Sequence, residues 1–225
     1  MIDEDKLSVR GLDEEIPGLY LPKQDRSQQA MSRVLTQFHL LLKKQAFADI
    51  QMSAVSKASG VGVGTIYFRF SSKDHLLIAL AEKITREEIE PKYQQFILPD
   101  SIQKQSLEEF LLAYFKVVST VFSDYRYLLK PLTLLSRETS DEKVTEFLNR
   151  MNSNIQQKLS KNMMGLARRS KPAVTAKSVE LAILWAGASL REEFLYKSPK
   201  SGLTHGEDQS FVQELSKALA GYLEA

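Results

Sequence analysis

Apolar residues recur every three or four positions along most of the chain, which is the period of an amphipathic helix. Such stripes occupy residues 25–44, 106–123, 140–168, 174–196 and 207–223, and a shorter apolar segment spans residues 125–136. Alternation with a period of two is essentially absent. The pattern therefore predicts an all-α fold without a β-sheet.

The ends of the first elements carry recognisable signals. Residues 1–25 contain Gly11, Pro17 and Gly18 among mixed charges and show no period, so we expect an extension that is mobile or docks on its own domain or on a partner. Ser71 and Asp74 have capping-box spacing and predict the start of a helix that runs to about Glu90, where Pro91 ends or kinks it.

Residues 52–70 are the most informative stretch. They read as two short helices joined by a tight turn at Gly60, where a positive φ is easiest without a Cβ atom. Val55 and Ala58 on the first helix, Val61 on the turn and Ile66 on the second supply the apolar contacts between them. This arrangement is how many proteins place a helix in the major groove of DNA.

The residues that follow this turn resemble a signature of the tetracycline-repressor (TetR) family. They read Gly64-Thr65-Ile66-Tyr67-Phe68-Arg69-Phe70, followed by Ser71-Ser72-Lys73-Asp74-His75-Leu76-Leu77. Gln51 and Gly62 depart from the family, which usually has a Ser or Thr cap and a Ser at these positions. The resemblance implies an N-terminal three-helix helix-turn-helix domain at 24–84, with its core at 51–70, between an acidic tail at 1–23 and a larger ligand-binding and dimerisation domain at 85–225.

Positive charge gathers in the same segment. The whole chain has a formal net charge of only +2. Residues 1–25 hold seven acids and three bases, whereas residues 26–74 hold seven bases and two acids, a net charge of +5. Residues 75–225 hold 20 bases and 19 acids. A basic segment of this kind is the expected footprint of phosphate contacts.

The candidate DNA contacts lie on and around the second helix of this motif. The solvent face is expected to carry Gly62, Val63, Thr65, Phe68 and Arg69, with Gly64 bringing main chain close to the bases. The resemblance assigns Thr65, Tyr67, Arg69 and Lys73 to backbone contacts. Arg26 and Ser53 complete the expected set, and the partner is double-stranded DNA that carries an inverted repeat.

The last two predicted helices have more apolar surface than one small domain needs. Ile183, Ala186, Leu190 and Phe194 share one face of the first, and Leu181, Leu184, Trp185 and Ala188 share another. We predict a homodimer interface of Ile183, Ala186, Gly187, Leu190, Phe194, Leu215, Leu219 and Tyr222. The alternative is that both helices complete the monomer core, and the family resemblance implies dimerisation here.

The middle of the chain is rich in aromatic and flexible apolar residues, which is typical of a pocket with a few polar groups. We expect a small, largely apolar ligand at Phe110, Tyr114, Phe122, Tyr125, Arg126, Arg137, Phe147 and Met151. Its binding would release a repressor from its palindromic operator. Two alternatives stay open: a regulator that responds to a protein partner, or a helical binding protein or enzyme with an accidental helix-turn-helix.

Several other classes find no support. The Gly60-x-Gly62-x-Gly64 run lacks a third Gly and a preceding strand, so it does not predict a dinucleotide site. No nucleophile elbow and no Glu-x-x-His pair is present, so we expect no enzyme, cofactor or metal. The chain has no Cys, no signal peptide and no apolar stretch long enough for a membrane, and we expect a cytoplasmic protein.

Overall fold

The computed structural model of the chain describes residues 7–9, 11–12, 15–96, 105–197 and 208–225. In this part of the chain the fold is all-α, as predicted, and the single bridge between extended segments joins Leu19 to Phe70. The chain forms two compact units: residues 1–89 with 127–151, and residues 90–126 with 152–225. None of the helices in the described part of the chain is long and apolar enough to cross a bilayer.

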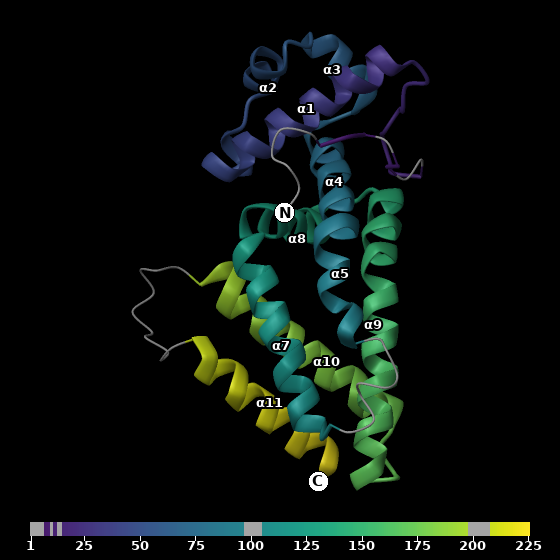
Figure 1. Cartoon of the computed structure of the whole chain (residues 1–225), viewed down its shortest axis with the longest axis vertical. Helices are drawn as coiled ribbons and strands as arrows, with labels where there is room; N and C mark the ends of the chain where they lie inside the picture. The colour runs from purple at the N-terminus through teal and green to yellow at the C-terminus, as the bar shows by residue number, and fades with distance from the viewer. Residues whose placement is uncertain (1–6, 10, 13–14, 97–104, 198–207) are drawn as a thin grey trace. The chain divides into compact units, whose positions relative to one another are not determined.

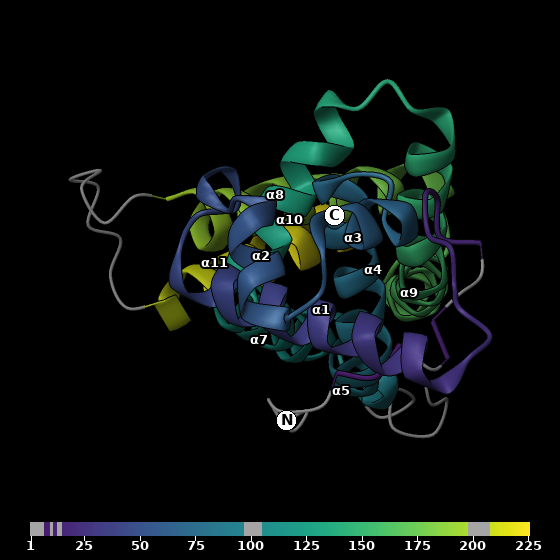
Figure 2. The same cartoon turned by 90° about the horizontal axis from the view of Figure 1, so that it is seen from above.

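The first unit begins with three helices that pack on one another (Figures 1 and 2). They are α1 (Asp25–Lys44), α2 (Met52–Ser59) and α3 (Val63–Arg69), and a short 3₁₀ turn, η1 (Phe47–Asp49), joins α1 to α2. Helix α1 buries a stripe at the predicted spacing, made of Met31, Val34, Leu35, Phe38 and Leu42. The two shorter helices, α2 and α3, both pack against α1.

Helix α4 (Lys73–Ile84) leaves this trio and is buried on every side from Leu76 to Ile84. Ser72 caps it and accepts a hydrogen bond from the backbone N–H of His75 at 3.2 Å, so the box predicted at Ser71 and Asp74 is wrong by one residue. The helix continues through the π-helical turn η2 (Thr85–Ile89) into α5 (Glu90–Tyr93) and the 3₁₀ turn η3 (Gln94–Phe96). A wide turn next to Pro91 lets the helical path go on although proline lacks an N–H donor.

The remaining elements of the first unit come from later in the chain. They are helix α8 (Arg126–Glu138) and the start of helix α9 (Glu142–Ser170). His39 of α1 is buried, and its Nε2 lies 2.7 Å from the hydroxyl of Tyr127 on α8. The two rings stack with their centres 5.5 Å apart. This pair ties α8 to α1.

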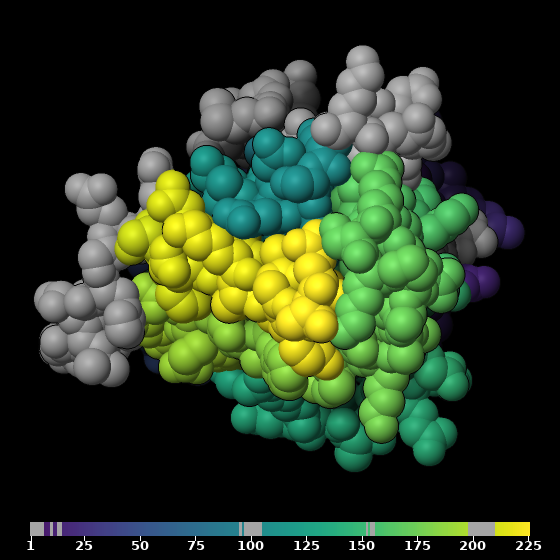
Figure 3. Space-filling view, turned by 90° about the horizontal axis from the view of Figure 1, so that it is seen from below, coloured from purple at the N-terminus to yellow at the C-terminus, as the bar shows by residue number. Residues whose placement is uncertain are grey.

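The second unit packs helix α7 (Leu107–Asp124) beside helix α11 (Asp208–Glu224), and Figure 3 shows their surfaces side by side. Helix α10 (Ala176–Arg191), with its π-helical end η4 (Glu192–Tyr196), contacts both of them. Ser106 and Glu109 form a capping box at the start of α7, and these hydrogen bonds hold the pKa of Glu109 below its usual value. The predicted start of the last helix, at residue 207, lies outside the described residues.

The described part of the acidic tail is docked on the first unit. Leu7, Val9, Leu12, Ile16 and Leu19 are all buried. Residues 1–6, 10 and 13–14 of the predicted tail lie outside the described residues. Of the alternatives that the sequence left open for this segment, the described residues 7–9, 11–12 and 15–22 take the one in which it docks on its own domain.

Candidate nucleic-acid interface

The turn between α2 and α3 is built around Gly60. Its φ of +68° lies in the left-handed region, and a Cβ atom added there would meet no atom within 4 Å. The glycine is therefore required by backbone conformation and not by space. The Ser56 hydroxyl donates to the carbonyl of Val61 at 2.7 Å, while Val55 and Ile66 bury their side chains between the helices. These contacts fix the angle between α2 and α3.

Helix α3 buries one side and exposes the other. Ile66 is 1% exposed and Phe70, which follows the helix, is fully buried, whereas Tyr67 and Phe68 are 45% and 67% exposed. Thr65 is also exposed, and Val63 is half-buried. Large exposed aromatic rings on a helix that is otherwise well anchored are typical of a surface that a partner covers.

Two glycines flatten the beginning of this exposed surface. A Cβ atom added at Gly64 would meet nothing within 4 Å, and one added at Gly62 would meet only the Thr65 hydroxyl oxygen, at 4.0 Å. Their φ angles are not in the left-handed region, so the fold itself does not require glycine here. Both positions instead let a bound partner approach the main chain closely.

Arg69 closes the exposed side of α3. Its guanidinium lies over the ring of Phe68 at 5.0 Å and donates to the carbonyl oxygen of Tyr20 at 3.3 Å. Arg26 and Ser53, at the starts of α1 and α2, are exposed. The structure therefore leaves Arg26 and Ser53 accessible on α1 and α2, while Arg69 is half-buried at the end of α3.

Lys73 has different surroundings. Its ammonium donates to the carbonyl oxygens of Phe47, Ala48 and Ile50 at 2.9, 3.2 and 3.2 Å, and it lies 4.5 Å from the centre of the Phe47 ring. The three donors of a lysine are thus directed at the loop between α1 and α2, and not at the phosphate expected from the sequence. In this structure Lys73 fastens the start of α4 to that loop.

These contacts predict that Lys73→Met lowers the free energy of unfolding by about 1–3 kcal/mol, because three carbonyl oxygens lose a charged donor. Chemical denaturation measures this change, and the salt dependence of DNA binding should stay as in the wild type. A variant with wild-type stability and a weaker salt dependence would return Lys73 to the phosphate contacts.

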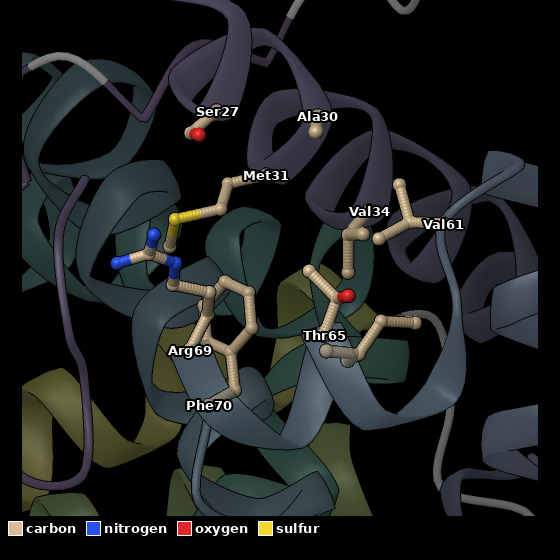
Figure 4. Close-up of a pocket in the computed structure, with 9 residues that line it drawn as sticks. Ser27, Ala30, Met31, Val34, Val61, Thr65, Arg69 and Phe70 are labelled. Carbon is tan, nitrogen blue, oxygen red and sulfur yellow. The ribbon is translucent and has the colours of Figure 1, made fainter. Parts of the chain in front are cut away.

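A small cavity of about 60 Å³ lies between α1 and α3 (Figure 4). Its walls are Ser27, Ala30, Met31, Val34, Val61, Thr65, Ile66, Arg69 and Phe70. Pockets for drug-sized ligands have volumes of roughly 300–1,000 Å³. This cavity is therefore a gap in the packing between α1 and α3, and it is too small for such a ligand.

The eight residues expected in a ligand pocket divide between the two units. Arg137, Phe147 and Met151 belong to the first unit, and Phe110, Tyr114, Phe122, Tyr125 and Arg126 belong to the second. Within the second unit Tyr114 is the centre of an aromatic cluster, with ring centres 5.6–6.4 Å from those of Tyr93, Phe96, Phe110 and Phe115. Burial raises the pKa of both Tyr93 and Tyr114 well above the usual value, so both phenols are neutral donors.

Arg126 is engaged with main chain rather than directed at a guest. Its guanidinium donates to the carbonyl oxygens of Leu195 and Lys197 at 3.0 and 2.8 Å, where η4 ends. Phe122 is half-buried and Tyr125 is buried. In the first unit Phe147 is buried, Met151 is half-buried and Arg137 is exposed.

Several residues of the predicted dimer interface lie on the side of α10 and α11 that is buried within the single chain. Ala186, Leu190, Phe194 and Leu219 are buried in the single chain, because this side of α10 and α11 packs the core. Ile183, Gly187 and Leu215 are half-buried. The exposed apolar side chains are Leu184 at 58%, Trp185 at 44% and Tyr222 at 38%, and the rings of Trp185 and Tyr222 lie 4.9 Å apart. Leu184 and Trp185 come from the second of the two faces that the sequence distinguished.

The tight turn, the buried side of α3 and its exposed aromatic side define a helix-turn-helix protein of the kind that binds DNA. Residues 40–80 match the family model described as bacterial regulatory proteins of the tetR family. The resemblance to the TetR family predicted from the sequence is thereby confirmed over residues 40–80, and this match supports a DNA-binding transcriptional regulator. The match supports a transcription factor rather than an enzyme.

The fold has solved relatives. The fatty acid degradation regulator FadR from Bacillus halodurans has 17% sequence identity and a TM-score of 0.59, and the alignment covers 89% of this chain and 97% of that one. Salmonella enterica GusR has 20% identity and a TM-score of 0.57, with 90% and 99% covered. These likenesses show the fold alone. The comparison with curated proteins gives no match.

Proposed function

We propose that this chain is a dimeric repressor that binds an inverted-repeat operator through α3 and releases it on binding a small, largely apolar ligand. The observation that carries the proposal is the exposed side of α3, where Thr65, Tyr67 and Phe68 stand next to two glycines that the fold does not require. Tyr67 and Arg69 contact phosphates, and the main chain at Gly62–Gly64 approaches the bases. The predicted boundaries at 23/24 and 84/85 remain our proposal for the functional domains.

The dimer in this proposal forms through the exposed apolar side of α10 and α11. Leu184, Trp185 and Tyr222 are large and exposed. The rings of Trp185 and Tyr222 also lie close together. A cluster of this kind is typical of an interface core. An inverted repeat requires two copies of α3, which a twofold dimer supplies. Such a protein acts where DNA is, in the cytoplasm of a bacterium.

The ligand in this proposal contacts the aromatic cluster around Tyr114. The cluster offers apolar ring surface, and its two neutral phenols are the polar groups that orient a guest. Effector binding acts on DNA affinity only through a difference in ligand affinity between two conformations, and about 1–3 kcal/mol is sufficient for a switch. Helix α4 connects the DNA-binding segment to the second unit along the chain and is the element whose tilt the ligand would bias.

Selection from a random DNA library tests the DNA-binding part of this proposal. We expect the wild type to enrich an imperfect inverted repeat, with half-sites one helical turn or a multiple of it apart. A gel-shift titration with decanoic acid, indole and naphthalene then tests the ligand part. At least one compound should weaken operator binding in the wild type and have less effect in Tyr114→Ala.

Two outcomes would contradict the proposal. If the library yields no common sequence, the regulator function through α3 is wrong. If an operator is found but none of the compounds weakens its binding or raises the melting temperature of the protein, the response to a protein partner becomes the better hypothesis.

A further inference from the structure

The N-terminal segment (described residues 7–9, 11–12 and 15–22) pairs antiparallel, at residues 18–20, with the end of the recognition helix α3 and the two residues that follow it. The backbone N–H of Tyr20 donates to the carbonyl of Arg69 at 2.9 Å, and the N–H of Ser71 donates to the carbonyl of Gly18 at 3.0 Å. Leu19 and Phe70 form the bridge between these two bonds. Gly18 therefore lies opposite Ser71, Leu19 opposite Phe70, and Tyr20 opposite Arg69.

This register decides which side chains face outwards. Directly opposite residues in an antiparallel pair lie on the same side, and successive residues alternate. Leu19 and Phe70 are both buried, so they are the inner pair. Tyr20, the next residue, is 59% exposed and lies opposite Arg69, which is half-buried. A tail residue thus stands beside the last residue of the recognition helix, on its outer side.

The segment is held along its whole described length. The N–H groups of Leu7 and Val9 donate to the hydroxyls of Thr36 and Ser32 on α1, at 3.2 and 3.1 Å. Arg86 donates to the carbonyl of Gly11, and Arg150 pairs with Glu15. A side chain on so well anchored a segment can bind a partner without the loss of entropy that ordering a free tail would require.

Gly18 shows how closely the segment lies on the unit. Its φ is +65°, and a Cβ atom added there would come within 2.4 Å of the His75 ring. The Ser71 hydroxyl also donates to the Gly18 carbonyl, at 3.2 Å. The chain therefore crosses the start of α4 in one defined path, which fixes the position of Tyr20.

The charges around Tyr20 fit a phosphate. Lys23 and Arg26 follow Tyr20 along the chain and Arg69 lies opposite it, with the carboxylate of Asp25 between Lys23 and Arg26 in the sequence. Lys23 and Arg26 are exposed, and Asp25 is exposed as well. The structure gives the Tyr20 hydroxyl and the Lys23 ammonium no partner among the described residues. The local balance is positive in a tail whose overall charge is negative.

We propose that Tyr20 and Lys23 extend the DNA-binding surface beyond α3 and bind the sugar–phosphate backbone. The phenol of Tyr20 donates a hydrogen bond to a phosphate oxygen, and the ammonium of Lys23 pairs with a phosphate. The inference rests on the proposed binding of DNA through α3, because the pairing with Arg69 places Tyr20 beside that helix. The acidic N-terminal tail is then part of the DNA-binding surface and not a separate extension.

The test uses the full chain, the operator selected by the wild type, and random DNA of the same length. Tyr20→Phe keeps the ring and removes the hydroxyl, and it should weaken binding to both DNAs about three- to tenfold, since phosphate contacts are independent of sequence. Lys23→Gln should lower the slope of log affinity against log salt by about 1 for each protomer. Lys177→Gln, which removes an exposed lysine of α10, is the matched control and should leave both quantities unchanged.

Tyr67→Phe on the recognition helix separates this inference from the proposed function. If the wild type binds and Tyr67→Phe weakens binding, but Tyr20→Phe and Lys23→Gln bind with wild-type affinity and salt slope, only the role of the N-terminal segment is wrong. If the wild type selects no DNA and binds none in a salt-dependent way, both proposals fail. A melting temperature equal to that of the wild type would show that each substitution acts on binding and not on stability.

Discussion

Trp185→Glu is expected to convert the protein into monomers that bind the operator about 100- to 10,000-fold more weakly than the wild type. Trp185 is 44% exposed and lies beside Tyr222, at 4.9 Å between ring centres, on the apolar side of α10 and α11. A carboxylate there would have to be desolvated in any dimer that forms through this side. Two recognition helices that are no longer joined lose the advantage of binding together, which is the source of the expected factor. Sedimentation velocity and gel shift measure the two effects.

The chain offers a direct reporter and a matched control for this experiment. Trp185 is its single tryptophan, so a red shift of the fluorescence on dilution of the wild type would follow the opening of the interface. Gln213→Glu adds the same charge at an exposed position of α11, half a turn around the helix from Tyr222, and should remain dimeric. A Trp185→Glu protein that sediments with the wild type would place the dimer interface elsewhere.

The sequence was sufficient for the fold and for the central motif, because these depend on local rules. The apolar stripe of α1 has the helical period, and Gly60 stands where the backbone needs a positive φ. The predicted limits of α1, Asp25 and Lys44, are those of the structure. Where a helix cap depends on one residue, as at Ser71 and Ser72, local rules left an uncertainty of one position.

The N-terminal segment was harder to predict because its structure depends on distant partners. Leu7, Val9, Leu12, Ile16 and Leu19 are the signal that sequence reasoning passed over, since their spacing is neither two nor three to four throughout. The prolines and glycines between them are typical of a segment without regular secondary structure. The burial of these apolar residues appears only when the fold is known.

Roles that depend on direction could not be read from a helical pattern either. Lys73 was expected at a phosphate, yet its ammonium donates to three carbonyls of the loop before α2. The sequence separated the two apolar faces of α10 correctly, but it could not tell which one the rest of the chain covers. Leu190 and Phe194 proved to be core, and Leu184 and Trp185 proved to be exposed.

Phe70→Ala should lower the free energy of unfolding by about 3–5 kcal/mol and abolish operator binding at protein concentrations where the wild type binds fully. Phe70 is fully buried, directly follows α3, forms the bridge to Leu19 and lines the cavity between α1 and α3. Its loss would enlarge that cavity and release both the N-terminal segment and the end of α3. Phe68→Ala, two residues earlier and 67% exposed, is the matched control: it should change stability by less than about 0.5 kcal/mol while still weakening DNA binding. Chemical denaturation and gel shift of the two variants distinguish the roles, and equal stability losses would show that the division of α3 into a buried and a DNA-binding side is wrong.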